Sequence, residues 1–295
     1  MSDYLCRKNR KLYLLLTLPA LSLYLFALII PLCFGTIPTS FYSWNLIKGN
    51  KKFCGFHNYI KLFQDDAFLH ALLFTIILAV FTIVVSNIIA FLVAFALDGG
   101  IRCKAFIRSC FFIPNIISGV MAAFVWMFIF TNAIPDLGKA LNLSFLENIS
   151  WFGSTGMATA AVIIVSSWQS TGFLMMLYIA GLQTVPNDVI EAARLDGCTG
   201  IKKIRYIQLP LIMPTITINL FISIAGSFKS LDIPLSLTGG APAGSTQTIA
   251  LNIYNDAFGS FKTGYASAKS VVLFLIVSII TIIQLVITRK REVQL

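Results

Sequence analysis

A short stripe of polar side chains interrupts an apolar stretch in the last third of the chain. Asn219, Ser223 and Ser227 recur every four residues, so on a helix they share one face. Hydroxyl and amide groups in this pattern can hydrogen-bond a polar solute, but they also join neighbouring helices. The stripe therefore indicates a solute pathway or interhelical packing. In either case it faces protein or water rather than lipid.

Other polar and aromatic side chains also lie inside apolar stretches: Ser86, Asn87, Trp126, Trp168 and Gln169. Each could contribute a hydrogen bond or an aromatic face to a pathway. Each also has an ordinary interpretation, because Ser and Asn join helices and Trp marks the membrane interface. The sequence leaves both interpretations open.

Catalytic and metal-binding patterns are absent from the sequence. It contains no G-x-x-x-x-G-K-[ST], G-x-S-x-G or H-E-x-x-H motif, and no cysteine pair has metal-ligand spacing. The 12 acidic residues fall in predicted tails, loops or span ends, which argues against a proton-coupled carrier. We therefore expect no enzyme, no catalytic residue, no metal site and no cofactor bound by this chain.

The composition favours a membrane protein. Of the 295 residues, 57% are hydrophobic and only 12% are charged, whereas soluble domains carry about 25% charged residues. The net charge of +10 comes from clusters at the ends of apolar runs. That placement is typical of a topology signal rather than of nucleic-acid binding.

Six apolar stretches reach the length of about 20 residues that a transmembrane helix needs. We predict spans at Leu12–Phe34, Ala71–Leu97, Ser109–Phe130, Met157–Leu182, Leu211–Phe228 and Val271–Thr288. An even number of spans places both termini on one side. That side holds 14 of the 22 basic residues, so we expect both termini to be cytoplasmic. The first outer loop, about Gly35–His70, is aromatic-rich and is expected to be interfacial and partly helical.

The predicted cytoplasmic loop between spans four and five has the features of a short helix. Thr184 is expected to cap it, Pro186 to lie in its first turn, and Gly197 to end it in a left-handed conformation. Ala192 and Ala193 give it a small exposed body that suits a partner groove. An ordinary connecting helix is the alternative.

The same loop carries a family resemblance. Glu191-Ala192-Ala193, Asp196-Gly197 and Leu209-Pro210 closely resemble the EAA motif of binding-protein-dependent ABC importer permeases. Two further regions resemble sugar permeases of the maltose and glycerol-phosphate type. One is Trp44-Asn45-Leu46 with Gly55–Tyr59, and the other is Leu237–Pro242 with Gln247-Thr248 and Ile253-Tyr254.

The resemblance implies an all-α, six-helix, type I ABC importer permease-like bundle in the bacterial cytoplasmic membrane. It would move a sugar, such as an oligosaccharide, by alternating access driven by a partner ATPase that hydrolyses ATP. The implied partners are a second permease subunit forming a heterodimer, two nucleotide-binding subunits and an extracytoplasmic solute-binding protein. The alternative is the same machine importing glycerol-3-phosphate or another non-sugar solute.

The resemblance also assigns roles to residues. Residues 1–70 would form the tail, first span and outer loop, and residues 71–295 the permease core, with a coupling loop at 183–210. Lys229, Ser230 and Asp232 would extend the pathway, although an interfacial ion pair between Lys229 and Asp232 is equally open. The implied ATPase-coupling residues are Glu191, Ala192, Ala193, Asp196 and Gly197, and the candidate pathway residues are Asn219, Ser223, Ser227, Lys229, Ser230, Asp232, Trp168 and Gln169.

Overall fold

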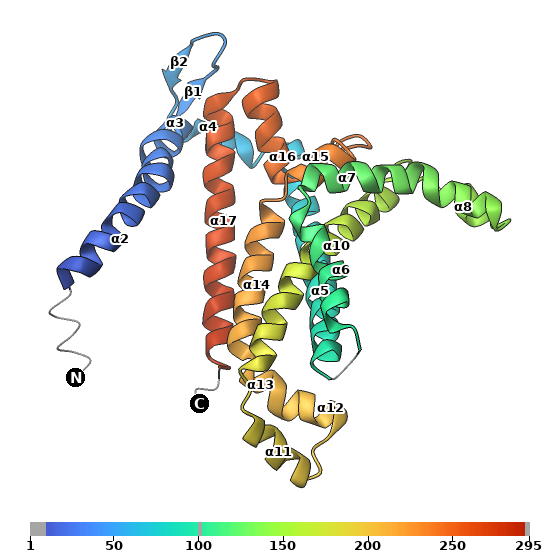
Figure 1. The fold of residues 1–295 in the computed structure, drawn as a ribbon. Coiled ribbons are helices and arrows are strands. Elements are labelled where there is room, and N and C mark those ends of the chain that lie inside the picture. Colours follow the sequence, from blue (N-terminus) through green and yellow to red (C-terminus); the bar gives the residue numbers. More distant parts are fainter. Residues whose placement is uncertain (1–9, 100–101, 293–295) are drawn as a thin grey trace. The chain divides into compact units, whose positions relative to one another are not determined.

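The computed structural model describes residues 10–99 and 102–292, with side chains from residue 17 onward. The described residues are mostly helical (Figure 1). They form two compact units, Met1–Asp65 with Ile253–Leu273 and Asp66–Asn252 with Phe274–Leu295. The predicted division into a part ending at residue 70 and a permease core remains a prediction.

The first unit begins with a long helical segment followed by a small hairpin. The helix α2 (Arg10–Tyr24) continues through π-helical turns η1 (Leu25–Ile29) and η2 (Pro31–Thr36) into α3 (Ile37–Ser40). Strands β1 (Tyr42–Trp44) and β2 (Lys51–Phe53) pair antiparallel, with Ser43 opposite Lys52. The unit also contains α4 (His57–Leu62), η5 (Asn255–Gly259) and the start of α17 (Thr263–Arg289).

The predicted outer loop is partly helical, as expected, but it also contains these two strands. A hydrogen-bonded turn explains them. Asn45 Oδ1 accepts the backbone N–H groups of Ile47 and Lys48, and Gly49 has a φ of 66°, which suits glycine. Asn58, which is buried, donates to the backbone oxygens of Ser40 and Tyr42 and so ties α4 to the hairpin.

The second unit is a helical bundle centred on α10 (Thr155–Gln183). This helix packs along α5 (Asp66–Asp98) and also contacts α6 (Lys104–Ile116) and α14 (Met213–Phe228). The remaining elements of the unit are α7 (Gly119–Phe128), η3 (Ile129–Ala133), α8 (Ile134–Ala140), α9 (Ser144–Glu147), α11 (Asn187–Leu195), α12 (Gly200–Lys203), η4 (Ile204–Gln208), α13 (Leu209–Leu211), α15 (Asp232–Leu237), most of α16 (Ile249–Tyr254) and the end of α17.

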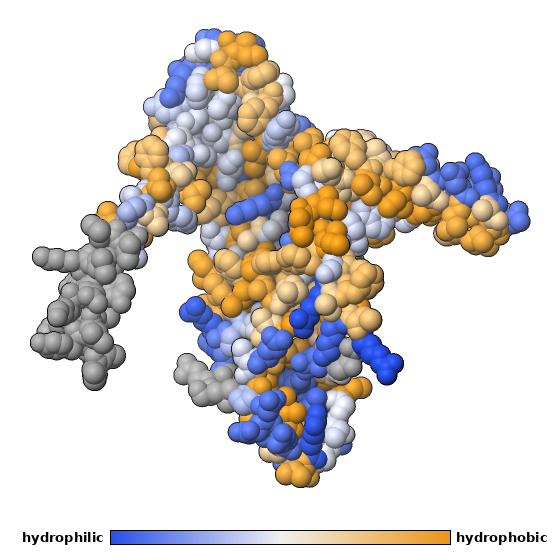
Figure 2. All heavy atoms as spheres, viewed as in Figure 1, coloured by the Kyte–Doolittle hydropathy of each residue, from blue (hydrophilic) through white to orange (hydrophobic). Residues whose placement is uncertain are grey.

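Five helical stretches among the described residues are long and apolar enough to cross a membrane, or six if one bent pair counts as a single span. They are Thr17–Ser40, Asp66–Asp98, Gly119–Ala140, Thr155–Gln183 and Thr263–Arg289, with Gly200–Leu211 and Met213–Phe228 as the bent pair. Six predicted spans agree with the upper number. In the second unit, hydrophobic residues cover much of the bundle surface, whereas hydrophilic residues cover most of the α11–α12 region (Figure 2).

The predicted boundaries of the third span are wrong. The stretch Ser109–Phe130 crosses a break at Ile117 and Ser118, which separates α6 from α7. Both residues have extended backbone, and Ser118 Oγ accepts the N–H of Met121 as the N-cap of α7. The candidate span begins after this break and continues through η3 into α8. Apolar composition is continuous across the break, so hydropathy did not locate it.

The fifth candidate span is bent close to its predicted start. The chain bends by 74° between Gly200–Leu211 and Met213–Phe228, so Pro210 lies before the bend and Pro214 opens α14. Pro is tolerated in the first turn of a helix because its missing N–H has no intrahelical partner there. The straight helix after the bend starts at Met213, close to the predicted start of the span at about Leu211.

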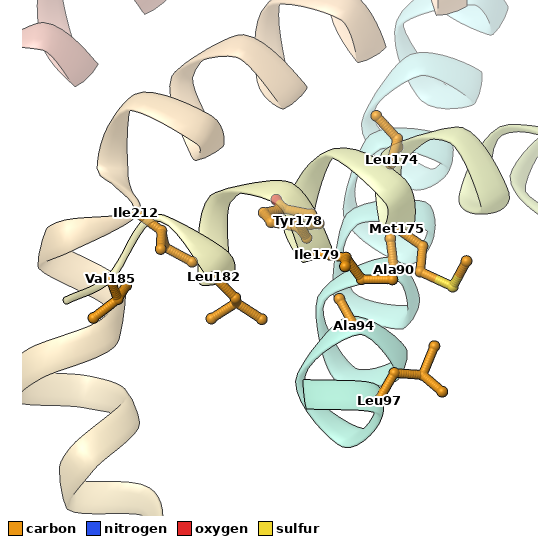
Figure 3. Packing of buried hydrophobic residues seen from close by; sticks show 10 residues of the cluster. All are labelled: Ala90, Ala94, Leu97, Leu174, Met175, Tyr178, Ile179, Leu182, Val185 and Ile212. Carbon is orange, nitrogen blue, oxygen red and sulfur yellow. The ribbon is translucent and has the colours of Figure 1, made fainter. Parts of the chain in front are cut away.

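Two apolar clusters hold the second unit together. One joins α5, α10 and the start of α14 through ten buried residues, among them Leu97, Met175 and Leu182 (Figure 3). The small residues Ala90 and Ala94 on α5 allow close approach in this cluster. The other cluster joins α5, α7, α10 and α15 through Phe74, Phe130, Val162 and Ile233.

Candidate functional site

A cavity of about 240 Å³, lined by both apolar and polar side chains, lies among α5, α6, α10, α14 and α15 of the second unit. Hydroxyl and amide groups dominate its polar lining. Among the described residues, none that lines it is ionisable. The lining residues are Leu78, Thr82, Ser86, Asn115, Ser166, Gln169, Ser170, Phe173, Leu174, Ile222, Ser223, Gly226, Ser227, Ser230 and Ile233.

A second cavity of about 410 Å³ adjoins the first. The two share Asn115, Gln169, Gly226, Ser230 and Ile233. Only the second includes charged side chains, those of Lys229 and Asp232. No ion pair joins these two residues in the described part of the chain, although the sequence left such a pair open. Both side chains line the second cavity.

The structure brings together six of the eight predicted pathway residues. Ser223, Ser227, Ser230 and Gln169 line the first cavity, and Lys229 and Asp232 join Gln169 and Ser230 at the second. Gln169 also donates from Nε2 to Ile117 O at 2.9 Å, which satisfies a carbonyl at the α6–α7 break. The pathway role of these residues remains a prediction.

The other two predicted residues line neither cavity. Asn219 is fully buried, and its Nδ2 donates to Leu174 O of α10 at 3.3 Å, so it joins two helices. Trp168 packs edge-on against Trp126, with ring centroids 5.5 Å apart. The alternative of interhelical packing, which the sequence left open, describes the contacts of both residues.

Sequence reasoning did not single out several residues of the lining. Thr82, Asn115, Ser166 and Ser170 line the first cavity beside Ser86, which was a weaker candidate. Thr82 with Ser86, and Ser166 with Ser170, repeat the four-residue spacing of the α14 stripe. This repeated spacing on three helices was the signal that could have found them.

Five of the hydroxyl groups that line the first cavity fall into two kinds. Those of Ser86, Ser170 and Ser223 donate to a backbone carbonyl four residues earlier, at 2.5–2.8 Å. Such hydroxyls keep lone pairs available as acceptors. Those of Thr82 and Ser166 are buried and have no hydrogen-bond partner in the described chain. Together the lining can accept and donate hydrogen bonds without carrying charge.

The loop between α10 and α14 forms a separate candidate site. Its first helix, α11, begins at Asn187 and is followed by Gly197 at a φ of 71°, the expected left-handed conformation. Cys198 N–H donates to Ala193 O at 2.8 Å, which closes the helix end. The expected cap is wrong, because Thr184 instead donates to Gly181 O in the last turn of α10, and Pro186 occupies the N-cap position.

The exposed face of this loop differs from the predicted pair of alanines. Ala193 is only 4% exposed, so Ala192 alone presents a small exposed side chain. Glu191, Asp196 and Gly197 are exposed as well. Two larger apolar side chains that sequence reasoning missed are exposed beside them: Leu195 at 90% and Ile201 at 81%. Apolar groups this exposed on a charged loop indicate a protein contact surface.

Comparison with known proteins places this arrangement in a family. The family model described as "Binding-protein-dependent transport system inner membrane component" matches residues 86–293. A probable starch degradation products transport system permease protein, AmyD of Thermoanaerobacterium thermosulfurigenes, is 37% identical over 98% of this chain and 97% of its own length. The multiple sugar-binding transport system permease protein MsmF of Streptococcus mutans is 34% identical over 86% of this chain and 87% of its own length.

A further relative is named for a different solute, and a solved structure shows the same fold. The sn-glycerol-3-phosphate transport system permease protein UgpA of Agrobacterium fabrum is 31% identical over 82% of this chain and 83% of its own length. A bacterial ABC transporter for import of the acidic polysaccharide alginate has a chain that superposes with a TM-score of 0.81 at 19% identity, covering 97% of both chains. With its apolar helices and its partly polar cavity, the chain belongs to the family of binding-protein-dependent transport system inner membrane components, as a multi-pass integral membrane permease.

Proposed function

We propose that this permease moves a neutral oligosaccharide through the cavity between α5, α10 and α14. The single observation that carries the proposal is the uncharged hydroxyl and amide lining of that cavity. Sugar hydroxyls both donate and accept hydrogen bonds, so this lining can replace their hydration shell. The relatives named for starch degradation products and for multiple sugars support the same solute class.

The uncharged lining disfavours the glycerol-3-phosphate alternative. A phosphate group that leaves water loses a large hydration energy unless paired cations replace it. The first cavity offers none among its described residues, and at the second cavity Asp232 opposes the charge of Lys229. A phosphorylated solute therefore lacks the compensation that this chain would have to supply.

Transport by the complete transporter tests this proposal. The two permeases, the ATPase subunits and the solute-binding protein are reconstituted in proteoliposomes, and ATP-dependent uptake of labelled maltotriose and other neutral oligosaccharides is measured. We expect saturable uptake of at least one of them, and no competition from sn-glycerol-3-phosphate. Uptake of sn-glycerol-3-phosphate with none of any neutral oligosaccharide would contradict the proposal.

We also propose that α11 is the coupling helix, docked on an ATPase subunit. The exposed side chains of Ala192, Leu195 and Ile201 support this role, because they offer apolar contact area on a polar loop. Glu191 and Asp196 would lie at the edge of the contact, and Gly197 would fix the direction in which the chain leaves α11. In this proposal, movement of the ATPase pair pushes α11 and rocks the spans.

Gly197→Pro tests the coupling role. Proline cannot adopt the φ of 71° found there, and it removes the N–H that donates to Arg194 O. We expect ATPase activity to persist while uptake falls at least about tenfold, with the complex still assembled. The matched control is Gly156→Ala at the start of α10, where an added Cβ meets nothing within 4 Å. Uptake at the wild-type level in a folded Gly197→Pro complex would exclude the coupling role.

The remaining assembly follows from the same proposal. A second permease as heterodimer partner, two ATPase subunits and a solute-binding protein would complete a transporter of the bacterial cytoplasmic membrane, with both termini cytoplasmic. Mild solubilisation and mass spectrometry of co-purifying proteins test the partners, and labelling of a terminal tag in intact cells tests the orientation. Recovery of the chain alone, or a tag labelled from outside, would contradict these assignments.

A further inference from the structure

A hydrogen-bonded chain crosses three helices and ends at the cavity wall. Tyr178 of α10 is 4% exposed, and its hydroxyl donates to Asn87 Oδ1 of α5 at 2.9 Å. Asn87 Nδ2 donates in turn to Ser223 Oγ of α14 at 3.0 Å. Of these three residues, only Ser223 lines the cavity. In this chain Tyr178 and Asn87 reach the cavity wall through Ser223, and Tyr178 also has a side-chain hydrogen bond with Asn219.

The amide of Asn87 is held in one orientation by two neighbours. Its Nδ2 also donates to Ile83 O at 2.9 Å, so both amide hydrogens have acceptors. The opposite orientation would turn Oδ1 toward the carbonyl oxygen of Ile83 and Nδ2 toward the donating hydroxyl of Tyr178. The contact with Ile83 O would be repulsive, whereas the Tyr178 hydroxyl could turn to accept from Nδ2, so the Ile83 carbonyl decides the orientation and Tyr178 adds a hydrogen bond to it. The chain therefore fixes which atom of Asn87 faces Ser223.

This orientation determines the hydrogen-bonding capacity of Ser223. A serine hydroxyl has one hydrogen to donate and two lone pairs to accept. Ser223 donates its hydrogen to Asn219 O at 2.7 Å and accepts one hydrogen bond from Asn87. One lone pair remains for the cavity, so Ser223 faces a ligand only as an acceptor.

We propose that Tyr178 and Asn87 are positioning residues that make Ser223 a dedicated hydrogen-bond acceptor for an O–H group of the transported solute. This inference rests on the proposed function, because it assigns a solute contact within the same cavity. It adds a specificity rule: a solute with a hydroxyl at the position facing Ser223 is preferred over its analogue lacking that hydroxyl.

A double-mutant cycle on the complete transporter tests this chain from Tyr178 through Asn87 to Ser223, called the relay below. The half-saturation concentration and maximal rate of maltotriose uptake are measured for the wild type, Ser223→Ala, Tyr178→Phe and the double variant. We expect each single change to raise the half-saturation concentration about three- to tenfold with little change in maximal rate. The double variant is expected to match Ser223→Ala, because Tyr178 acts through Ser223.

Tyr59→Phe is the matched control for these variants. Its hydroxyl also makes a buried hydrogen bond, to Ser40 Oγ at 2.6 Å, but within the first unit. We expect it to leave the half-saturation concentration unchanged. Effects of Ser223→Ala and Tyr178→Phe that multiply in the double variant would overturn the relay, as would an unchanged half-saturation concentration in Tyr178→Phe.

A second measurement needs no solute and separates this inference from the proposed function. Ser223→Cys is placed in the assembled transporter after replacement of the native cysteines, and its reaction rate with a small methanethiosulfonate reagent is recorded. The N–H of Asn87 favours the reactive thiolate at that position. Adding Tyr178→Phe is expected to change the rate at least about threefold, whereas adding Tyr59→Phe leaves it unchanged.

The two measurements distinguish a failure of the proposed function from a failure of the relay. If the wild type takes up no neutral oligosaccharide, the proposed function is wrong, and the thiol rates still decide whether Tyr178 controls position 223. If uptake occurs but Tyr178→Phe leaves either the half-saturation concentration or the thiol rate unchanged, the relay is wrong and the proposed function stands.

Discussion

Two buried polar networks of this permease use opposite chemistry. In the first unit, Lys269 is 1% exposed, and its Nζ lies 2.6 Å from Asp256 Oδ2 and 3.2 Å from Asp65 Oδ2. Tyr265 completes the group by donating to Asp65 Oδ2 at 2.7 Å. In the second unit, the network of Tyr178, Asn87 and Ser223 is uncharged throughout and reaches the cavity wall.

The charged network fixes the segments that it joins, whereas the neutral network borders a surface that can exchange hydrogen bonds. Breaking a buried ion pair leaves an unpaired charge, so the charged network holds the outer loop, η5 and the start of α17 together as one body. Neutral hydroxyls can exchange one hydrogen-bond partner for another at lower cost. The cavity proposed to bind and release a solute is bordered by the second kind.

The largest expected effect comes from Lys269→Met. It leaves the partly buried carboxylates of Asp65 and Asp256 without this cation, which costs about 3 kcal/mol of folding free energy. We expect a strongly lowered melting temperature of the purified complex. The exposed Lys262, in the same unit, provides the control Lys262→Met. Equal melting temperatures for the two variants would remove the structural role of the charged network.

Gly172→Ala tests whether the second unit depends on the close approach of its helices. A Cβ at Gly172 would overlap the backbone oxygen of Phe111, where α10 meets α6. Such overpacking costs about 1–3 kcal/mol, so we expect reduced stability and a displaced α6. Gly156→Ala lies in the same helix and has open space. A wild-type melting temperature for Gly172→Ala would contradict this packing.

The smallest expected effects distinguish Asn219 from Ser223, which lie one turn apart on α14. Asn219→Ala removes the hydrogen bond to Leu174 O and should lower stability by about 1 kcal/mol, with the half-saturation concentration of uptake retained. Ser223→Ala should instead raise the half-saturation concentration of uptake and leave the stability nearly unchanged. Thermal melting and uptake kinetics on the same preparations check both. If both variants change only uptake, Asn219 belongs to the pathway after all.

Local sequence signals predicted the parts of the molecule that depend on local rules. Apolar length indicated six spans, and Gly197 indicated the end of α11, because a left-handed residue after a helix strongly favours glycine. The break at Ile117 escaped hydropathy, because both flanking helices are apolar. Only the Ser118-Gly119 cap marks it.

Long-range relations could not be predicted in the same way. Asp65 is far in the sequence from Asp256 and Lys269, and each of the three alone is typical of a loop or span-end charge. Asn219 and Ser223 share one helix face by spacing, yet only Ser223 reaches the cavity, because Asn219 meets the backbone of α10. Which side of a polar stripe borders a cavity depends on the neighbouring helices.

The most direct test of the central claim compares two solutes that differ only in charge. ATP-driven uptake of maltotriose and of a singly phosphorylated maltotriose is measured with the reconstituted transporter, and each rate is normalised to the occupancy of the solute-binding protein. The uncharged cavity predicts transport of the neutral sugar at least about tenfold faster. Equal normalised rates, or faster transport of the phosphorylated sugar, would contradict selection by this cavity.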